Sequence, residues 1–126
     1  MEHATVLIVV DDLFFLAKIQ TTLTHLGLSS QVVTQEVALQ QHLQQQTALP
    51  VLMVVDLTLR GSDPVALIRA SRSVERTAPL AILAFGAHVA VESRQQALQA
   101  GADRVVAKSE FSQHLPALIQ QHLQQA

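Results

Sequence analysis

Three acids and one lysine follow directly on apolar segments of this chain. Asp11 and Asp12 end the run VLIVVDD, Asp56 ends VLMVVD, and Lys108 follows RVVA. Carboxylates gathered in one place repel one another, so a cluster of them needs a cation to neutralise it. A hard divalent ion such as Mg²⁺ is suited to this, because it prefers oxygen ligands and commonly keeps several of its waters. The four residues are therefore candidates for a magnesium site with a lysine beside it.

The same side chains could take part in phosphoryl transfer. An aspartate beside a divalent ion can act as the nucleophile and form an aspartyl phosphate. Asp56 is the expected acceptor because it stands alone, whereas Asp11 and Asp12 can hold the ion from the side. Lys108 supplies a point charge that can offset negative charge or bind an incoming anion. Taken singly, an acid at a strand end is more often a helix cap, as we expect for Asp12, and a lysine is more often solvated.

The segments that must position these residues alternate between strands and helices. Continuous apolar runs are typical of strands covered on both faces, and they occupy residues 6–10, 31–34, 51–56, 80–85 and 104–107. This order predicts an α/β fold with a doubly wound, flavodoxin-like parallel sheet of five strands in three layers, forming one domain over residues 1–126. The carboxyl ends of parallel strands share one edge, so the four charged side chains are expected to converge.

Hydrophobic spacing predicts one helix between the first two strands and further helices at about residues 35–46, from 62 onward, 88–99 and 110–124. Aliphatic residues at helical spacing predict the inward face of the first helix: Leu16, Ile19, Leu23 and Leu26. Gly27 is placed to end that helix. Asp63 before Pro64 is typical of a helix cap rather than of a fourth acid in the site. Pro116 lies near the start of the last helix, which could therefore begin later than residue 110.

Composition narrows the classes of function. The chain has 126 residues, of which 14% are charged, and its formal net charge is -2. Typical soluble domains have roughly 25% charged residues, so this weakly charged surface favours self-association or a docking partner. The eight Lys and Arg residues are scattered, which predicts no direct binding to nucleic acid or to an anionic membrane. Without cysteine or a signal-peptide core, a cytoplasmic location is expected.

The motifs VLIVVDD, VLMVVD and AGADRVVAKS resemble those of response-regulator receiver domains of two-component signalling, and the resemblance covers essentially the whole chain. It implies that Asp11 and Asp12 bind Mg²⁺ and that the carbonyl of Thr58 completes the metal shell. It also implies that Asp56 accepts phosphate from a histidine kinase or a histidine phosphotransfer protein, while Lys108 contacts the phosphoryl group. Beyond self-phosphotransfer and autodephosphorylation, such a domain is not an enzyme.

The chain departs from the receiver pattern where that family changes conformation. Receivers carry a threonine or serine at the end of the fourth strand, but the candidates here are Ala84, Phe85 and Gly86, which lack a hydroxyl. The aromatic residue usual in strand five falls at Val105, and Ser109 replaces the proline after the lysine. We therefore expect phosphorylation with an atypical conformational response. The alternative is a phosphorylation-independent pseudo-receiver that serves as a protein interaction or dimerisation module. A flavodoxin-like cofactor binder is disfavoured, because no phosphate loop follows the first strand.

Two surfaces are candidates for partners. At least one of Phe14 and Phe15 is expected to face outward near the acceptor, where it could dock a helix carrying a phosphorylatable histidine. The alternative is that both rings pack beneath neighbouring loops. The second surface comprises the fourth helix, the fifth strand and the last helix, through which the resemblance implies a possible homodimer. Its charged residues are Glu92, Arg94, Arg104 and Glu110. His88 is expected to be a loop or cap residue rather than a base.

Overall fold

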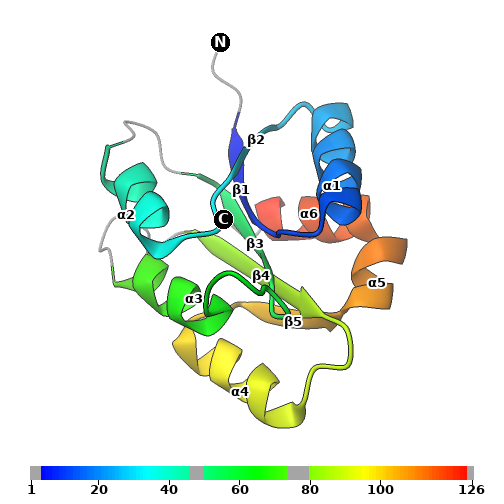
Figure 1. Cartoon of the computed structure of the whole chain (residues 1–126). Helices are drawn as coiled ribbons and strands as arrows, with labels where there is room; N and C mark the ends of the chain where they lie inside the picture. The colour runs from blue at the N-terminus through cyan, green and yellow to red at the C-terminus, as the bar shows by residue number, and fades with distance from the viewer. Residues whose placement is uncertain (1–3, 46–49, 74–79, 125–126) are drawn as a thin grey trace.

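The computed structural model describes residues 4–45, 50–73 and 80–124, and within these ranges five parallel strands form one sheet (Figure 1). The strands are β1 Thr5–Val9, β2 Ser29–Val32, β3 Leu52–Asp56, β4 Ala81–Gly86 and β5 Arg104–Ala107. Their order is β2-β1-β3-β4-β5, and all neighbouring pairs are parallel. The α/β doubly wound fold is thus confirmed, and its strand order reverses between β1 and β3, where ligands bind in such sheets.

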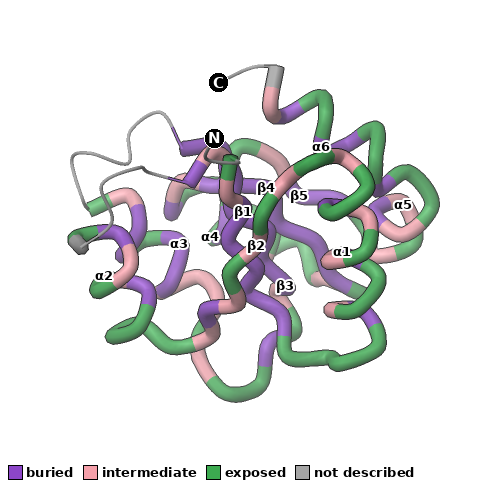
Figure 2. The backbone as a smooth tube through the Cα atoms, turned by 90° about the horizontal axis from the view of Figure 1, so that it is seen from above, coloured by how far each residue is buried: buried purple, intermediate pink, exposed green. Residues whose placement is uncertain are grey.

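Helices cover both faces of the sheet. They are α1 Leu13–His25, α2 Glu36–Gln45, α3 Pro64–Arg72, α4 Val91–Ala100, α5 Lys108–Gln113 and α6 Leu115–Gln124. Figure 1 shows α1, α5 and α6 on one face and α2, α3 and α4 on the other. Alternate residues of each strand point to opposite layers, so Val54 packs under α1 and α6 while Met53 and Val55 pack under α2 and α3. Burial on both faces explains the unbroken apolar runs, which Figure 2 shows as buried central strands.

Several elements begin one or more residues away from their predicted positions, and β2 and α4 are clear examples. β2 occupies Ser29–Val32 rather than residues 31–34, because it is an edge strand that pairs through its backbone with β1, from Thr5↔Ser29 to Ile8↔Val32. Its side chains alternate between exposed and half-buried, so they carry a weaker apolar signal. α4 begins at Val91 rather than at 88, and His88 before it has a left-handed backbone with φ of 54°. His88 therefore lies in the β4–α4 loop, as predicted.

The last predicted helix, residues 110–124, is two helices. α5 ends at Gln113 and α6 begins at Leu115. Pro116 has no backbone N–H, so it cannot donate to the carbonyl of Ser112 as the fourth residue along a continuous helix would. That carbonyl instead accepts a hydrogen bond of 3.0 Å from Nζ of Lys18 on α1. The proline therefore divides the helix and lets α1 bind at the break.

The buried face of α1 and the caps of two helices agree closely with the sequence predictions. Its buried side chains are Phe15, Ile19 and Leu23, while Leu16 and Leu26 are only partly buried against the same cluster. The inward stripe is thus rotated slightly toward Phe15. Gly27 follows the end of the helix with φ of 75°, as predicted. The predicted cap at Asp63 is also confirmed, since its Oδ1 accepts from the N–H groups at positions 65 and 66 of α3.

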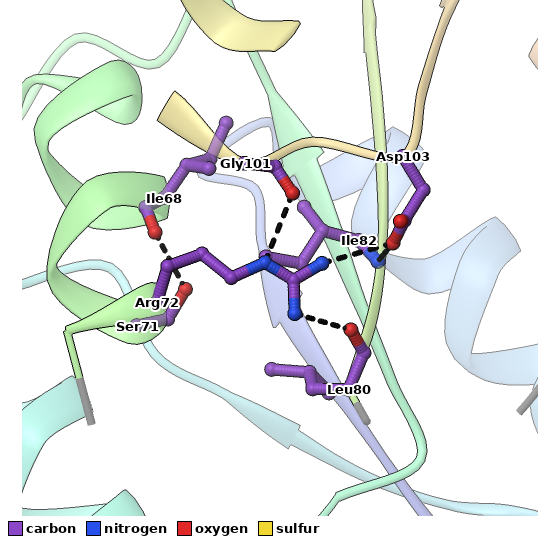
Figure 3. A network of polar contacts seen from close by, with 7 residues as sticks. All are labelled: Ile68, Ser71, Arg72, Leu80, Ile82, Gly101 and Asp103. Atoms are coloured by element: carbon purple, nitrogen blue, oxygen red, sulfur yellow. Dashed lines mark hydrogen bonds and ion pairs between the residues drawn. The ribbon is translucent and has the colours of Figure 1, made fainter. Parts of the chain in front are cut away.

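Arg72, at the end of α3, joins this helix to the segments that lead into β4 and β5 (Figure 3). Its Nε donates to the Gly101 carbonyl at 3.0 Å and its Nη1 to the Leu80 carbonyl at 2.6 Å. Its Nη2 lies 3.0 Å from Oδ2 of Asp103, which also accepts the Ile82 N–H at 2.7 Å. A Cβ at Gly101 would lie 2.4 Å from Cγ of Arg72, so only glycine leaves room for this arginine. The guanidinium thus ties the amino-terminal edge of the sheet to α3, opposite the charged edge.

Candidate functional site

A cavity of about 470 Å³ lies at the carboxyl edge of the sheet, where β1, β3 and β5 end. Its lining consists of Asp11, Asp12, Asp56, Thr58, Arg60 and Lys108. Segments from three strands meet here because the strands are parallel and β1 lies beside β3 at the point where the strand order reverses. The structure therefore brings together every side chain that the sequence singled out, and adds Arg60 to them.

Asp56 ends β3 and is only 3% exposed. Its Oδ1 accepts two hydrogen bonds from one residue, at 2.8 Å from the Thr58 N–H and at 2.6 Å from the Thr58 hydroxyl. Hydrogen bonds to a carboxylate are stronger than bonds between neutral groups, so this pair holds the side chain in one orientation. No donor among the described residues bonds Oδ2 of Asp56, which leaves that oxygen for a ligand.

Asp11 and Asp12 likewise each use one carboxylate oxygen to accept hydrogen bonds from backbone N–H groups. Oδ1 of Asp12 caps α1 by accepting the N–H groups of Phe14 at 3.0 Å and Phe15 at 3.2 Å. The predicted cap is therefore real, yet the other oxygen of Asp12 remains on the cavity. Asp11 accepts the Arg60 N–H at 3.1 Å through Oδ2. Each of the three carboxylates thus commits one oxygen to the backbone of a loop or helix and presents the second to the cavity.

Lys108 is the first residue of α5, directly after β5. Its Nζ lies 3.8 Å from Oδ2 of Asp12 and 4.9 Å above the ring centroid of Phe15, a cation–π contact. Phe15 in turn packs edge-on against Phe85 and Phe111, and the last two rings are stacked with centroids 4.2 Å apart. An aromatic cluster from α1, β4 and α5 therefore forms a rigid floor under the lysine. Sequence analysis missed this floor, although Phe15 follows Asp12 by three residues and Phe111 follows Lys108 by three.

The oxygen groups of the cavity are suited to a magnesium ion that keeps some of its waters, rather than to a metal whose ligands all come from the protein. Within residues 4–45, 50–73 and 80–124, no three His, Cys, Asp or Glu side chains lie close enough to hold a metal between them. Magnesium does not require such a cage, because it binds through one or two carboxylates and keeps waters in its other positions. The oxygens that Asp11, Asp12 and Asp56 present to the cavity are of the hard type that it prefers.

The end of β4 lacks a hydroxyl. Gly86 is its last residue and pairs with Ala107 in β5, so Gly86, rather than Ala84 or Phe85, is the β4 residue beside Lys108. A Cβ built on Gly86 would lie 2.4 Å from Cγ2 of Val89 and 3.7 Å from Cγ2 of Thr58. The space that a side chain would need is therefore taken up by Val89.

The two candidate partner surfaces differ in the side chains that they expose to a partner. Phe14 is 93% exposed, whereas Phe15 is buried, so one of the two rings faces outward as predicted. On the second surface three of the four charged side chains, those of Arg94, Arg104 and Glu110, have partners within the chain. Arg94 donates to the Val105 carbonyl at 3.2 Å, and Arg104 lies 3.5 Å from Glu110.

Comparisons with known proteins point to one family. The model of the response regulator receiver domain matches residues 6–120. A CheY-like receiver domain protein from Methanospirillum hungatei JF-1 has a similar fold, with a TM-score of 0.79, 19% identity and coverage of 98% of this chain and 95% of that one. The phosphorylated cyanobacterial phytochrome response regulator RcpA gives a TM-score of 0.84 at 15% identity, over 99% and 97% of the two chains.

A response regulator from Thermotoga maritima gives a TM-score of 0.77 at 19% identity, over 98% and 99% of the chains. At these identities the solved structures support the fold and nothing finer. The comparison with curated proteins finds no match. In the described part of the chain, no helix has the length and apolar character that crossing a membrane requires.

Proposed function

The chain belongs to the response regulator receiver family, and on that premise we propose that it accepts a phosphoryl group on Asp56 from a phosphohistidine partner. Receiver domains act in two-component signalling, generally bind Mg²⁺ at their acidic pocket and are generally not enzymes. One observation carries the proposal for this chain. The buried carboxylate of Asp56 is fixed through Oδ1 and presents Oδ2 to a cavity that also holds two acids and a lysine.

The chemistry is a direct displacement at phosphorus. A bond forms between Oδ2 of Asp56 and the phosphorus as the N–P bond of the phosphohistidine breaks, and the electron pair returns to the imidazole nitrogen. Asp56 reacts as a carboxylate, so no base is needed to activate it. Lys108 is placed to offset charge on the transferred oxygens, and the aromatic floor keeps its ammonium at the cavity.

Magnesium would supply further charge neutralisation at the phosphoryl oxygens when bound. The candidate ligands are the carboxylates of Asp11, Asp12 and Asp56 and the carbonyl of Thr58, of which one or two carboxylates would bind the ion directly and the others through its waters. The partner would be a histidine kinase or a histidine phosphotransfer protein, and Phe14 on the rim would contact it. We expect residues 1–126 to work as one domain in the cytoplasm, without direct contact to nucleic acid.

A second candidate function follows from the end of β4. Gly86 offers no hydroxyl and Val89 fills the adjacent space, so the end of β4 has no side-chain hydroxyl that could bond a phosphoryl oxygen. A pseudo-receiver would use the same fold for interaction, or for dimerisation through α4, β5 and the last predicted helix, now α5 and α6, independently of phosphate. The intact acids and lysine around the cavity favour the first function over this one.

Incubation with acetyl phosphate and Mg²⁺, followed by intact mass measurement, tests the choice. We expect the wild-type chain to gain the mass of one phosphoryl group and Asp56→Asn, which keeps the shape but loses the nucleophile, to gain none. Omission of Mg²⁺ should also prevent the gain. A wild-type chain that stays unmodified under these conditions would favour the pseudo-receiver.

A further inference from the structure

One residue supplies both of the donors that hold the acceptor carboxylate. Thr58 donates its backbone N–H and its hydroxyl to the same oxygen of Asp56, at 2.8 Å and 2.6 Å. The expected contribution of Thr58 was its carbonyl alone, so the hydroxyl is unexplained by the function proposed above. We propose that the Thr58 hydroxyl is the positioning hydroxyl of this site, which holds Asp56 for attack through Oδ2. This inference rests on Asp56 being the phosphoryl acceptor.

The geometry around Gly86 explains why this hydroxyl comes from the β3–α3 loop. A side chain on Gly86 would meet Cγ2 of Val89 at 2.4 Å and Cβ of Leu57 at 3.4 Å, so β4 cannot carry a hydroxyl without rearrangement. The methyl of Thr58 lies 3.7 Å from the same point. Thr58 therefore places its methyl toward the end of β4 and its hydroxyl toward Asp56.

The loop that carries this threonine is itself anchored on both sides of it. The Leu57 N–H, before Thr58, donates to the Phe85 carbonyl at 2.8 Å, and the Arg60 N–H, after it, donates to Oδ2 of Asp11 at 3.1 Å. Leu59 is buried in the core between these two bonds. Because the loop is held on both sides of Thr58, its hydroxyl cannot move far from the carboxylate, and a fixed donor positions a nucleophile better than a mobile one.

The hydroxyl should affect both directions of the reaction. With Oδ1 bonded to two donors, the carboxylate cannot rotate, and Oδ2 alone forms the bond to phosphorus. In the acyl phosphate, Oδ1 becomes a carbonyl oxygen, which accepts a weaker hydrogen bond than a carboxylate does. During hydrolysis water attacks phosphorus, the P–Oδ2 bond breaks, and its electron pair returns to the carboxylate. The Thr58 hydroxyl stabilises that leaving carboxylate, so its removal should slow hydrolysis. Phosphorylation should slow only through the lost orientation of Asp56, because the bond weakens as the carboxylate attacks.

Thr58→Val tests the inference because it keeps the branched shape and removes the hydroxyl. With acetyl phosphate and Mg²⁺, we expect the lifetime of its phosphorylated form to rise about tenfold, as for loss of one charge-assisted hydrogen bond. Its maximal phosphorylation rate should fall by a smaller factor, about fivefold, because only the orientation of Asp56 is lost in that direction. The half-saturating concentration of acetyl phosphate should stay unchanged, since positioning acts on the step after binding. Thr58→Ser retains the hydroxyl and should restore both rates to within about threefold.

Thr24→Val is the matched control. Thr24 is exposed on α1 and donates its hydroxyl to the Gln20 carbonyl at 2.9 Å, so the control loses the same group away from the cavity. It should behave as wild type. Wild-type kinetics in Thr58→Val would overturn the inference while leaving the proposed function intact, and equal slowing in Thr58→Ser would overturn it in favour of packing by the methyl. A wild-type chain that takes no phosphoryl group would overturn the proposed function and the inference together.

Discussion

Nζ of Lys108 lies 3.8 Å from Oδ2 of Asp12, which connects the start of α5 to the end of β1 across the cavity. The side chains of this pair are 36% and 44% exposed. A pair so accessible to water contributes less than about 1 kcal/mol to stability. Its effect is therefore to fix where the ammonium lies.

Replacing Lys108 with methionine should separate this effect from stability. We expect Lys108→Met to slow phosphorylation by acetyl phosphate more than about tenfold, because Lys108 supplies the ammonium among the described residues that line the cavity. The midpoint of urea unfolding should change little. Lys18→Met is the control, since Lys18 is exposed and bonds Ser112 away from the cavity. An unchanged phosphorylation rate in Lys108→Met would contradict the role given to the lysine.

The two neighbouring phenylalanines should respond in opposite ways. Phe15 is buried and touches Phe85, Phe111 and Lys108, so Phe15→Ala should lower the free energy of unfolding by about 3–5 kcal/mol. Phe14 is 93% exposed, and Phe14→Ala should change that free energy by less than about 0.5 kcal/mol. If Phe14 docks a partner, its loss should slow phosphotransfer from a phosphohistidine protein and leave modification by acetyl phosphate unchanged. Equal slowing with both donors would contradict docking.

Substitutions at the end of β4 test whether Val89 occupies the space that a side chain on Gly86 would need. Gly86→Ala puts a Cβ 2.4 Å from Cγ2 of Val89, so we expect the free energy of unfolding to fall by about 1–3 kcal/mol. The double change Gly86→Ala with Val89→Ala should recover most of this loss. Gly61→Ala is a suitable control, because its Cβ would meet only Gln35, at an ordinary 3.6 Å. Chemical denaturation of wild type, Gly86→Ala, Val89→Ala and the double variant would measure the coupling, and additive effects of the two changes would show that the residues do not compete for space.

The fold and the charged residues of the site could be predicted because both follow from the regular alternation of apolar strands and helices along the chain. Buried parallel strands carry unbroken apolar runs, and their carboxyl ends meet at one edge, so Asp11, Asp56 and Lys108 had to lie near each other once the strand order was known. Edge strand β2 was shifted because its position depends on backbone pairing with β1 rather than on side-chain hydrophobicity.

The contacts that refine the site were not predictable from spacing. The rings of Phe15, Phe85 and Phe111 come from three elements and meet only after the sheet has been covered. The hydroxyl of Thr58 is two residues from Asp56, but its bond depends on the conformation of a loop. A hydroxyl two residues after a strand-terminal acid would be a reasonable signal to examine, since short polar side chains commonly bond nearby groups in turns.

Arg72 should be important for stability, although it lies at the edge of the sheet opposite the cavity. Arg72→Met leaves the carbonyls of Leu80 and Gly101 without this donor, and we expect the free energy of unfolding to fall by about 1–3 kcal/mol. Arg72→Lys should recover little, because a compact ammonium cannot match the spread of the guanidinium. Arg69→Met, an exposed position on the same helix, is the control for loss of one positive charge. Urea unfolding should place both Arg72 variants well below Arg69→Met, and similar midpoints for all three would show that the network in Figure 3 contributes little.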